Sequence, residues 1–545
     1  MRVPLTLGFV ALVALTAPSR AEDLGGIGRI EDGVAAANAK VGTPPNVIDE
    51  DFVTKLLATG TDPLENPSGI ITDFARLSDG GAADKKGTLT EPDENTYLKL
   101  RQNPGGPDAH YDYGRRFLFQ GHENGGSRAY VTRINLDVPR GDNHRITLLT
   151  PVDAKTGLTG LNSIDGSTYN PFTGTLLFTQ ETSSGGHGTG QVIQITANWP
   201  PQVSTLGAFL GLGGYEGIHP DDHGDIYIIE DIGGTRPGGT LNGIALNAAA
   251  QPNSFVYRYL PNDPHRIEAG GLLQALQVTI DGTPVVFTPG AAAADIVATA
   301  QLKLHTPGTK WPVKWVTIHV SHEGDTASFN ATAAAKAAGA TPFKRPENMA
   351  WLPGSDFKTF FFDPTGDTDA PTSLVPELAA RGSWGSIFRV DLRDEDGWCD
   401  ADDDHDRRGM RPQDDGKISI FFLGDKTHNS FDNLAFANER QLLATEDRGD
   451  TLHNQLNTLD SIWAFDVRSK KAAPLRFLAL TRDATSLANG EDNEPTGIFV
   501  SNGSPRVGGM LGTEEALEGA RGFFTQQHGD NKVFELIKVK RHDRD

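Results

Sequence analysis

Short runs of apolar and β-branched residues, broken by glycine, proline, aspartate and asparagine, recur along most of the chain. They stand at 116–119, 128–135, 146–150, 175–179 and 191–196, among other places. Strands this short, separated by turn residues, are typical of an all-β fold. The 62 glycines and 33 prolines favour tight connections and leave little room for long helices. The pattern therefore predicts an all-β protein.

Three segments share a more detailed plan, in which acids bracket a pair of strands joined by a turn. Glu347 opens the first pair and Asp363 closes it; Glu216 with Asp231, and Asp432 with Asp447, bracket the other two. Fourteen residues separate Glu216 from Glu230, and also Asp432 from Glu446. Repetition on this scale indicates structural repeats stacked around a shared axis. We therefore expect a β-propeller in which each repeat forms one blade.

In a propeller, equivalent strand ends meet at one rim, and the acids at those ends would meet there too. Crowded carboxylates do not all stay ionised without cations between them. Oxygen ligands of this kind suit calcium or similar hard ions. The alternative interpretation is that these acids are ordinary polar strand ends facing water.

Some stretches depart from the strand pattern. Residues 51–59 form a helical candidate, and alanine-rich segments at 245–250, 291–300 and 325–339 predict helical insertions over one face. We divide the chain into a signal peptide (1–21), an N-terminal arm with an outer strand (22–110) and the propeller (111–545).

The first 21 residues have the pattern of a secretory signal. Arg2 precedes an apolar run from Leu5 to Ala17, and Ser19-Arg20-Ala21 supplies small residues near a cleavage site. The pattern predicts a secreted or periplasmic protein. The run is short for a membrane span, and no other stretch approaches one.

Charge and cysteine content narrow the possibilities. A formal net charge of −22 argues against nucleic acid or an anionic membrane surface as partner. The single cysteine, Cys399, excludes an internal disulfide. Alternating aspartates from Asp400 to Asp406 fail the EF-hand pattern, and we interpret them as a solvated loop. The sequence also has no GxSxG and no P-loop motif.

Several short motifs resemble those of the bacterial PhoX-type alkaline phosphatases. Gly339-Ala340-Thr341 followed by Arg345-Pro346-Glu347 is similar to the family's GAT…RPE segment. Further similar motifs follow in the family's order; they are His122-Glu123, Tyr215-Glu216-Gly217, Glu230-Asp231, Asp432-Asn433-Leu434, Glu494-Pro495-Thr496-Gly497 and Gln527-His528. Together they span roughly residues 115 to 535.

The resemblance implies a six-bladed propeller that hydrolyses phosphate monoesters with calcium and iron at one mouth. It makes Arg345 the phosphate clamp and Glu347 a second catalytic residue. The metal ligands it implies are Glu123, Glu181, Glu216, Asp231, Glu347, Asp432 and Glu494. A planar guanidinium suits phosphate because it donates two parallel hydrogen bonds.

The chain departs from the family at the segment Thr179-Gln180-Glu181-Thr182. The family has T-C-E-E here, and its cysteine ligates iron; Gln180 has no thiolate to offer. Iron (Fe³⁺) is therefore in doubt, whereas calcium is still expected.

The favoured function is hydrolysis of a small-molecule phosphate ester assisted by bound metal. Two alternatives are open. One is a non-catalytic, calcium-stabilised extracellular propeller that acts as a binding module. The other is a different calcium-dependent propeller hydrolase, of the lactonase or phytase type.

Overall fold

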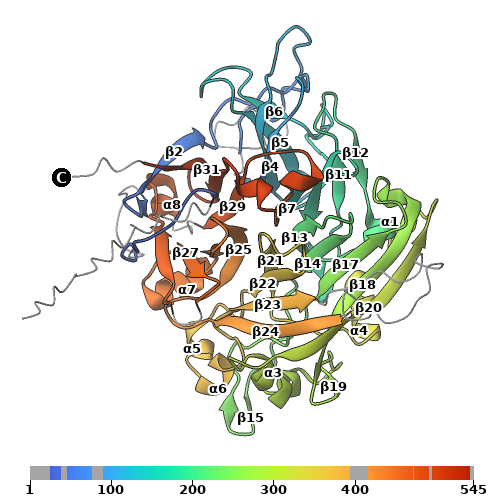
Figure 1. Ribbon diagram of the computed structural model, residues 1–545, viewed down its shortest axis with the longest axis vertical. Helices are drawn as coiled ribbons and strands as arrows, with labels where there is room; N and C mark the ends of the chain where they lie inside the picture. Colours follow the sequence, from blue (N-terminus) through green and yellow to red (C-terminus); the bar gives the residue numbers. More distant parts are fainter. Residues whose placement is uncertain are drawn as a thin grey trace, which may run out of the picture.

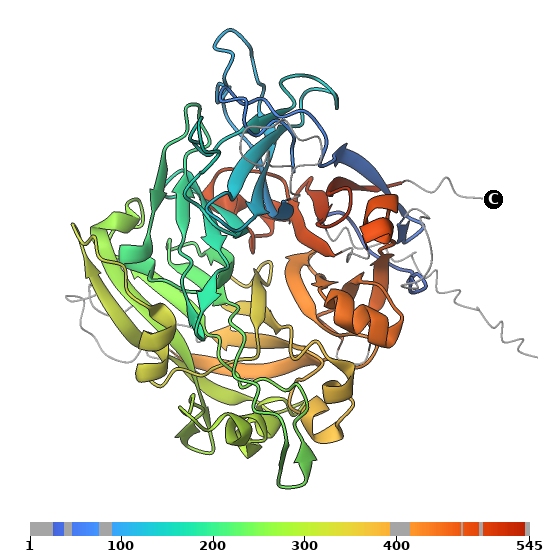
Figure 2. The ribbon, with the colours of Figure 1, turned by 180° about the vertical axis from the view of Figure 1, so that it is seen from behind.

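The computed structural model describes residues 25–37, 46–75, 90–392, 415–469, 472–489 and 494–539. The predicted signal segment, Cys399 and the loop from Asp400 to Asp406 lie outside these residues. The described chain is all-β with a few short helices. Its sheets follow one another around a central axis in chain order (Figure 1), and the same ring is seen from behind in Figure 2.

Four of the sheets are separate and contain four or five strands each. The first two are β3 (Glu91–Lys99), β4 (Arg116–Glu123), β5 (Tyr130–Asn135) and β6 (Ile146–Leu148), then β7 (Ile164–Asn170), β8 (Thr175–Gln180), β11 (Ile193–Ile195) and β12 (Val203–Thr205). The last two are β25 (Phe431–Phe436), β26 (Gln441–Glu446), β27 (Ser461–Asp466), β28 (Leu475–Ala479) and β1 (Val47–Ile48), then β29 (Pro495–Ser501), β30 (Arg521–Gln526), β31 (Lys532–Lys538) and β2 (Phe52–Ala58).

A ten-stranded sheet lies between these two pairs. Its order is β13 (Tyr215–Pro220), β14 (Ile226–Glu230), β17 (Val256–Pro261), β18 (Gly270–Ile280), β20 (Trp311–His322), β24 (Asp415–Leu423), β23 (Ser386–Leu392), β22 (Thr359–Pro364) and β21 (Pro346–Trp351), with β19 (Thr283–Pro284) paired to β18. The prediction of six separate blades is therefore not met. Strand β20 pairs with β18 on one side and β24 on the other, and so joins two groups of strands into one sheet.

The first strands of the successive strand groups surround the axis. Each of β3, β7, β13, β21, β25 and β29 contacts the next, and β29 contacts β3, so the ring closes. Adjacent sheets pack face to face; Phe361 of β22, Phe431 of β25 and Trp463 of β27 belong to one buried cluster. Apolar contact between neighbouring sheets thus fixes the ring whose centre holds the site.

The N-terminal arm supplies outer strands. Strand β1 pairs with β28, and β2 pairs antiparallel with β31 from Phe52↔Lys538 to Ala58↔Val533. The predicted helix at 51–59 is wrong, because this backbone pairing with the far end of the chain overrides a weak local preference for helix. Phe52 is buried there against Phe477.

The alanine-rich predictions are partly confirmed. Helices α2 (Ala292–Ile296), α3 (Thr299–Leu304) and α4 (Ala331–Ala337) form, whereas residues 245–250 begin in β16 (Ile244–Ala245) and continue without a helix. The short elements outside the sheets are α1 (Gly207–Leu210), α5 (Ala370–Ser373), α6 (Pro376–Ala379), α7 (Gly449–Leu456) and α8 (Ala484–Asn489), together with the small hairpins β9 (Ser183–Ser184) with β10 (His187–Gly188) and β15 (Thr240–Leu241) with β16. In the described part of the chain, no helix combines the length and apolarity that a membrane span requires.

Candidate metal centre

Every strand of the inner ring carries a β-bulge at the same place. Pairing with the following strand is interrupted over two residues near the start of β3, β7, β13, β21, β25 and β29. A bulge redirects a side chain that regular pleating would point elsewhere. In five of the six strands, the first bulged residue is an acid; these residues are Asp93, Asp165, Glu216, Glu347 and Asp432, and the sixth position holds Gly497.

The strand that pairs with each inner strand ends beside this bulge and contributes a second residue. Glu123 follows His122, which pairs with Pro92; Glu181 follows Gln180, which pairs with Ile164. Asp231 and Asp447 follow the equivalent residues of β14 and β26, and Thr365 follows that of β22. The axis is therefore lined by two tiers of side chains, and both tiers are acidic in the groups that begin with β3, β7, β13 and β25.

Three carboxylate clusters result, and each obeys the same rule. Each combines the bulge acid of one inner strand, the strand-end acid beside it and the bulge acid of the next inner strand. The clusters are Asp93–Glu123–Asp165, Asp165–Glu181–Glu216 and Glu216–Asp231–Glu347, and within each the ligand oxygens lie within 4.8 Å of one another. Asp165 and Glu216 each belong to two clusters, so the three form a continuous arc.

Burial dominates the electrostatics of this arc. It raises the pKa of Asp93 to about 7 and that of Glu181 to about 8, and neighbouring carboxylates add to both shifts. Burial and the neighbouring acids also raise the pKa values of Glu123, Asp165, Glu216 and Glu347 well above their usual range. Ionising all of these groups together requires positive charge among them.

The residues fit divalent cations. The clusters offer only oxygen donors, and Asp165 Oδ1 is buried without a hydrogen-bond partner within the described chain. A buried acceptor of this kind is costly unless something binds it. Three carboxylates at each junction suit calcium or another hard ion.

Arg345 supplies counter-charge at the third cluster. Its Nε lies 2.9 Å from Asp231 Oδ2, and its Nη2 lies 3.5 Å from Glu347 Oε1. Its side chain is 24% exposed, whereas that of Asp231 is 4% exposed. The Asp231 carboxylate raises the pKa of Arg345, which therefore stays charged. The guanidinium thus contacts the buried acids and is also partly exposed at the mouth.

The backbone of Arg345 has φ = 51°, in the left-handed region. Pro346, which follows it, disfavours the right-handed helical region for Arg345. A non-glycine residue rarely adopts this conformation, and it is found preferentially where function fixes a side chain. Here it directs Arg345 toward Asp231 of the neighbouring strand group.

Neutral side chains hold several of the acids in place. Gln527 Nε2 donates to Asp93 Oδ2 at 2.8 Å and to Glu123 Oε2 at 3.1 Å. Thr365 Oγ1 donates to Glu347, and Thr496 Oγ1 donates to Asp93. These donors favour the ionised carboxylates and so oppose the effect of burial.

The structure brings together most of the predicted ligands. Glu123, Glu181, Glu216, Asp231 and Glu347 lie in the three clusters. Asp432 occupies the bulge of β25, and the pKa of its carboxyl is raised well above its usual range by burial and by Asp93 and Glu347. Glu494 lies outside the three clusters, 3.5 Å from His528 Nε2.

Sequence reasoning missed Asp93 and Asp165, which belong to the clusters, and the nearby buried acid Glu94. Asp93 precedes position 111, where we placed the start of the propeller, and strand β3 lies inside the ring. Asp165-Gly166 repeats the acid-then-glycine pair of Glu216-Gly217, and this signal was available in the sequence.

By the sequence resemblance, Gln180 stands where the PhoX-type family has its cysteine. Its side chain is buried, and Nε2 donates to the backbone oxygen of Asn162 at 2.7 Å. An amide held in this way offers a metal at most its carbonyl oxygen, so the position does not fit a thiolate-ligated iron.

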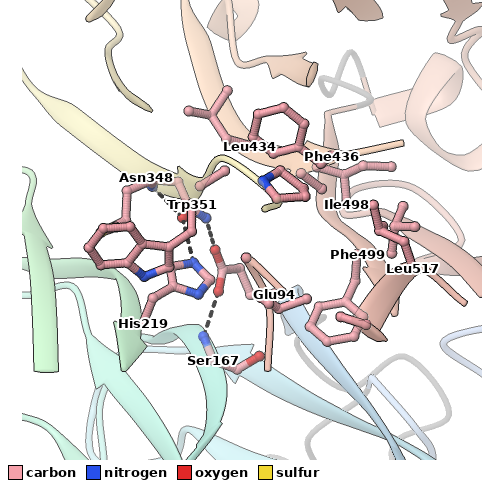
Figure 3. Close-up of a pocket in the computed structure, with 18 of the residues that line it drawn as sticks. Glu94, Ser167, His219, Asn348, Trp351, Leu434, Phe436, Ile498, Phe499 and Leu517 are labelled. Atoms are coloured by element: carbon pink, nitrogen blue, oxygen red, sulfur yellow. Dashed lines mark hydrogen bonds between the residues drawn. The ribbon is translucent and has the colours of Figure 1, made fainter. Parts of the chain in front are cut away.

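Beneath the acids, the axis holds a small cavity of about 40 Å³. Trp351, Phe436 and Phe499 form much of its wall, and Glu94 lies at its polar end between Ser167 and Asn348 (Figure 3). Ser167 N donates to Glu94 Oε2 at 2.5 Å, and Asn348 Nδ2 donates to Oε1. Because a water needs about 10–15 Å³, this cavity accommodates a few waters and no larger ligand.

Fold and site together define a propeller-like protein whose mouth carries acidic clusters that suit metal ions. The model of the family described as "Alkaline phosphatase PhoX" matches residues 239–495. The predicted resemblance to the PhoX-type alkaline phosphatases is confirmed by this match, which supports a hydrolase of the phosphatase type.

A solved structure supports the fold. "Pseudomonas fluorescens PhoX in complex with vanadate, a transition state analogue" is 12% identical, with a TM-score of 0.54 over 94% of this chain and 98% of that chain. An aldose sugar dehydrogenase from Streptomyces coelicolor in its PQQ-bound form is also 12% identical, with a TM-score of 0.31 over 90% and 99% of the two chains. No curated protein matches the chain.

Proposed function

We propose that this protein is a metal-dependent phosphatase that hydrolyses small-molecule phosphate esters at the propeller mouth. One observation carries the proposal. Three carboxylate clusters, built by the same rule at successive junctions, form an arc that ends at the guanidinium of Arg345. Cations and a fixed guanidinium are what a phosphoryl group requires as it transfers, because its charge is spread over several oxygens.

The cations we propose are calcium ions, one at each cluster. Asp93, Glu123 and Asp165 would hold the first; Glu181 and Glu216 complete the second with Asp165, and Asp231 and Glu347 complete the third with Glu216. Bound there, divalent cations supply Lewis-acid polarisation of phosphoryl oxygens. Iron is not part of the proposal, because Gln180 does not provide the thiolate that the family's iron takes.

Arg345 is the residue we propose to contact the phosphoryl group. Its side chain reaches the exposed mouth, and Asp231 orients it through Nε. A guanidinium has five N–H donors in a rigid plane, so its outer nitrogens have donors for phosphoryl oxygens. Glu347, which lies 3.5 Å from Arg345 Nη2, positions that group and completes the third cluster.

Two further features complete the proposal. The ten-stranded sheet corresponds to two blades, one beginning with β13 and the other with β21, which gives six blades around the ring. The protein acts in a secreted or periplasmic location, on the strength of the signal pattern at residues 1–21.

The test is hydrolysis of p-nitrophenyl phosphate by the purified full chain with calcium, and again with a chelator. We expect turnover that the chelator abolishes. Arg345→Ala should lower kcat/KM about a hundredfold or more. Arg345→Lys keeps the charge but loses the planar guanidinium, so its kcat/KM should lie between those of the wild type and Arg345→Ala. Circular dichroism of both variants controls for folding. Undiminished turnover in Arg345→Ala contradicts the assigned role.

The non-catalytic calcium-stabilised propeller is the second candidate, and Gln180 favours it because a family metal ligand is replaced. This candidate predicts tightly bound calcium, measured by elemental analysis, without turnover of any phosphate ester. A third candidate, a lactonase-type or phytase-type hydrolase, predicts turnover of a lactone or of phytate in preference to p-nitrophenyl phosphate.

A further inference from the structure

A second and much larger pocket, of about 920 Å³, opens beside the metal centre. Its walls come from the loop after β8, the loop after β14, the segments 251–253 and 287–294, and helix α4, and they include Gly186, Gly233, Asn253, Phe287 and Lys336. The two loops follow directly on Glu181 and Asp231, which belong to the carboxylate clusters. The pocket therefore adjoins the place where the proposed reaction occurs.

The walls of this pocket are held in fixed positions. Asn253 Nδ2 donates to the carbonyls of Gly186 and Gly233 at 3.3 and 3.2 Å, which ties the two loops together. Helix α4 is anchored from below, where Thr332 Oγ1 donates to Glu230 Oε1 at 2.6 Å. A preformed pocket of this kind binds a ligand at a low cost in ordering.

Among the described residues that line the pocket, Lys336 is the only Lys, Arg, Asp or Glu. Its Nζ lies 4.4 Å from the ring centroid of Phe287 and donates to the Gly186 carbonyl at 3.1 Å. An ammonium has three N–H donors, so this position has further donors to offer. In a chain with a formal net charge of −22, one cation in an otherwise uncharged pocket selects for an anionic group.

We propose that this pocket binds the organic part of the substrate, and that Lys336 recognises a second anionic group carried there, away from the phosphoryl group. This inference rests on the proposed phosphatase function. It narrows the substrate class to phosphate esters that have a second negative charge several bonds from the ester, such as a carboxylate. Phe287 forms the apolar wall beneath the ammonium and keeps it in position.

The test compares two substrates with the same six-carbon skeleton. 6-Phosphogluconate carries a carboxylate where glucose 6-phosphate has none. We expect the wild type to favour 6-phosphogluconate, and Lys336→Gln to lower the ratio of the two kcat/KM values about tenfold, mainly through KM for 6-phosphogluconate. Glutamine keeps N–H donors but no charge, whereas Lys336→Arg keeps the charge and should keep the ratio within about twofold.

A lysine outside the pocket serves as the control. Lys314→Gln removes an exposed lysine of β20 that does not line the pocket, and its ratio should equal that of the wild type. An unchanged ratio in Lys336→Gln, while the enzyme hydrolyses both esters, overturns the pocket assignment alone. Failure of the wild type to hydrolyse p-nitrophenyl phosphate or either sugar phosphate overturns the proposed function as well.

Discussion

Two acids of the metal centre, Asp165 and Glu216, are shared between neighbouring clusters. Removing a shared carboxylate weakens two junctions, whereas removing one at the end of the arc weakens one. Asp93 and Asp165 provide a matched comparison, since both are buried aspartates at the same bulge position.

We predict that Asp165→Asn lowers calcium affinity at two sites and that Asp93→Asn does so at one. The reason is that asparagine keeps the size of the side chain and removes the negative charge that a hard cation requires. Calorimetric titration of the metal-free variants with calcium measures the number of sites affected. Equal losses in the two variants would show that the clusters do not share Asp165.

A different residue, His305, contributes to the response of stability to acid. His305 is buried beside Phe388, and its Nδ1 lies 2.8 Å from the backbone oxygen of Gln301. Burial lowers the pKa of His305 to about 4, from a usual value of 6.5. The unfolded chain therefore takes up a proton between pH 6.5 and pH 4 that the folded chain refuses, and stability falls as the pH falls through this window.

The expected loss from His305 alone is about 3 kcal/mol between pH 7 and pH 4. His305→Gln keeps a donor for the Gln301 carbonyl and removes the titration. Urea unfolding of the wild type and the variant across this range isolates the effect, because all other groups titrate in both. Parallel pH profiles for the two proteins would contradict the prediction.

At the scale of the elements, the β-bulge near the start of each inner strand directs an acidic side chain toward the axis in five of the six strands. The second bulged residue is glycine in β7 and β13, and neighbouring strands approach closely there. A Cβ added at Gly166 would lie 2.1 Å from the backbone oxygen of Glu216. Glycine is thus required at this position by the contact between inner strands rather than by its own turn.

We predict that Gly166→Ala lowers the free energy of unfolding by about 2 kcal/mol or more and weakens calcium binding at the second cluster, because it pushes β13 away from β7. Gly125→Ala is the control, since a Cβ there meets nothing within 4 Å and should change stability by less than about 0.5 kcal/mol. Urea unfolding measures both variants. Equal stabilities would mean that the inner strands adjust freely.

At the scale of the whole molecule, the ring of strands gathers carboxylates at its centre, and repulsion between them destabilises the fold. Six inner strands bring five bulge acids to one axis. Cations that bind the folded ring and not the unfolded chain stabilise the fold by mass action. Cations bound among the central carboxylates would therefore raise the stability of the fold.

Removing metal should accordingly lower the melting temperature. We expect EDTA-treated protein to melt at least about 5 °C below protein in excess calcium, and calcium, but not sodium at equal ionic strength, to restore it. Differential scanning calorimetry measures the shift. A melting temperature that is indifferent to calcium would remove the basis for the proposed sites.

The resemblance to the PhoX-type family behaves differently from the local predictions. It rests on motifs such as Arg345-Pro346-Glu347, whose chemistry is visible in the sequence. It also predicts Glu181 and Glu123 as site residues from the sequence alone. It also included Glu494, which lies outside the three clusters beside His528. The order of the motifs along the chain indicates the ring of strands, whereas the contacts that each side chain makes depend on the local backbone.

The sequence by itself determined the all-β class, the repeated hairpins with acids at their ends, and the convergence of Glu216 and Glu347 at one mouth. These follow from alternation and turn chemistry, which are local. Only the tertiary structure decided that 52–58 is a strand, that β20 merges two groups into one sheet, and that Asp93 and Asp165 belong to the centre. Each of these depends on pairing between residues far apart in the chain, and strand register at a bulge is set by the partner strand rather than by the sequence around it.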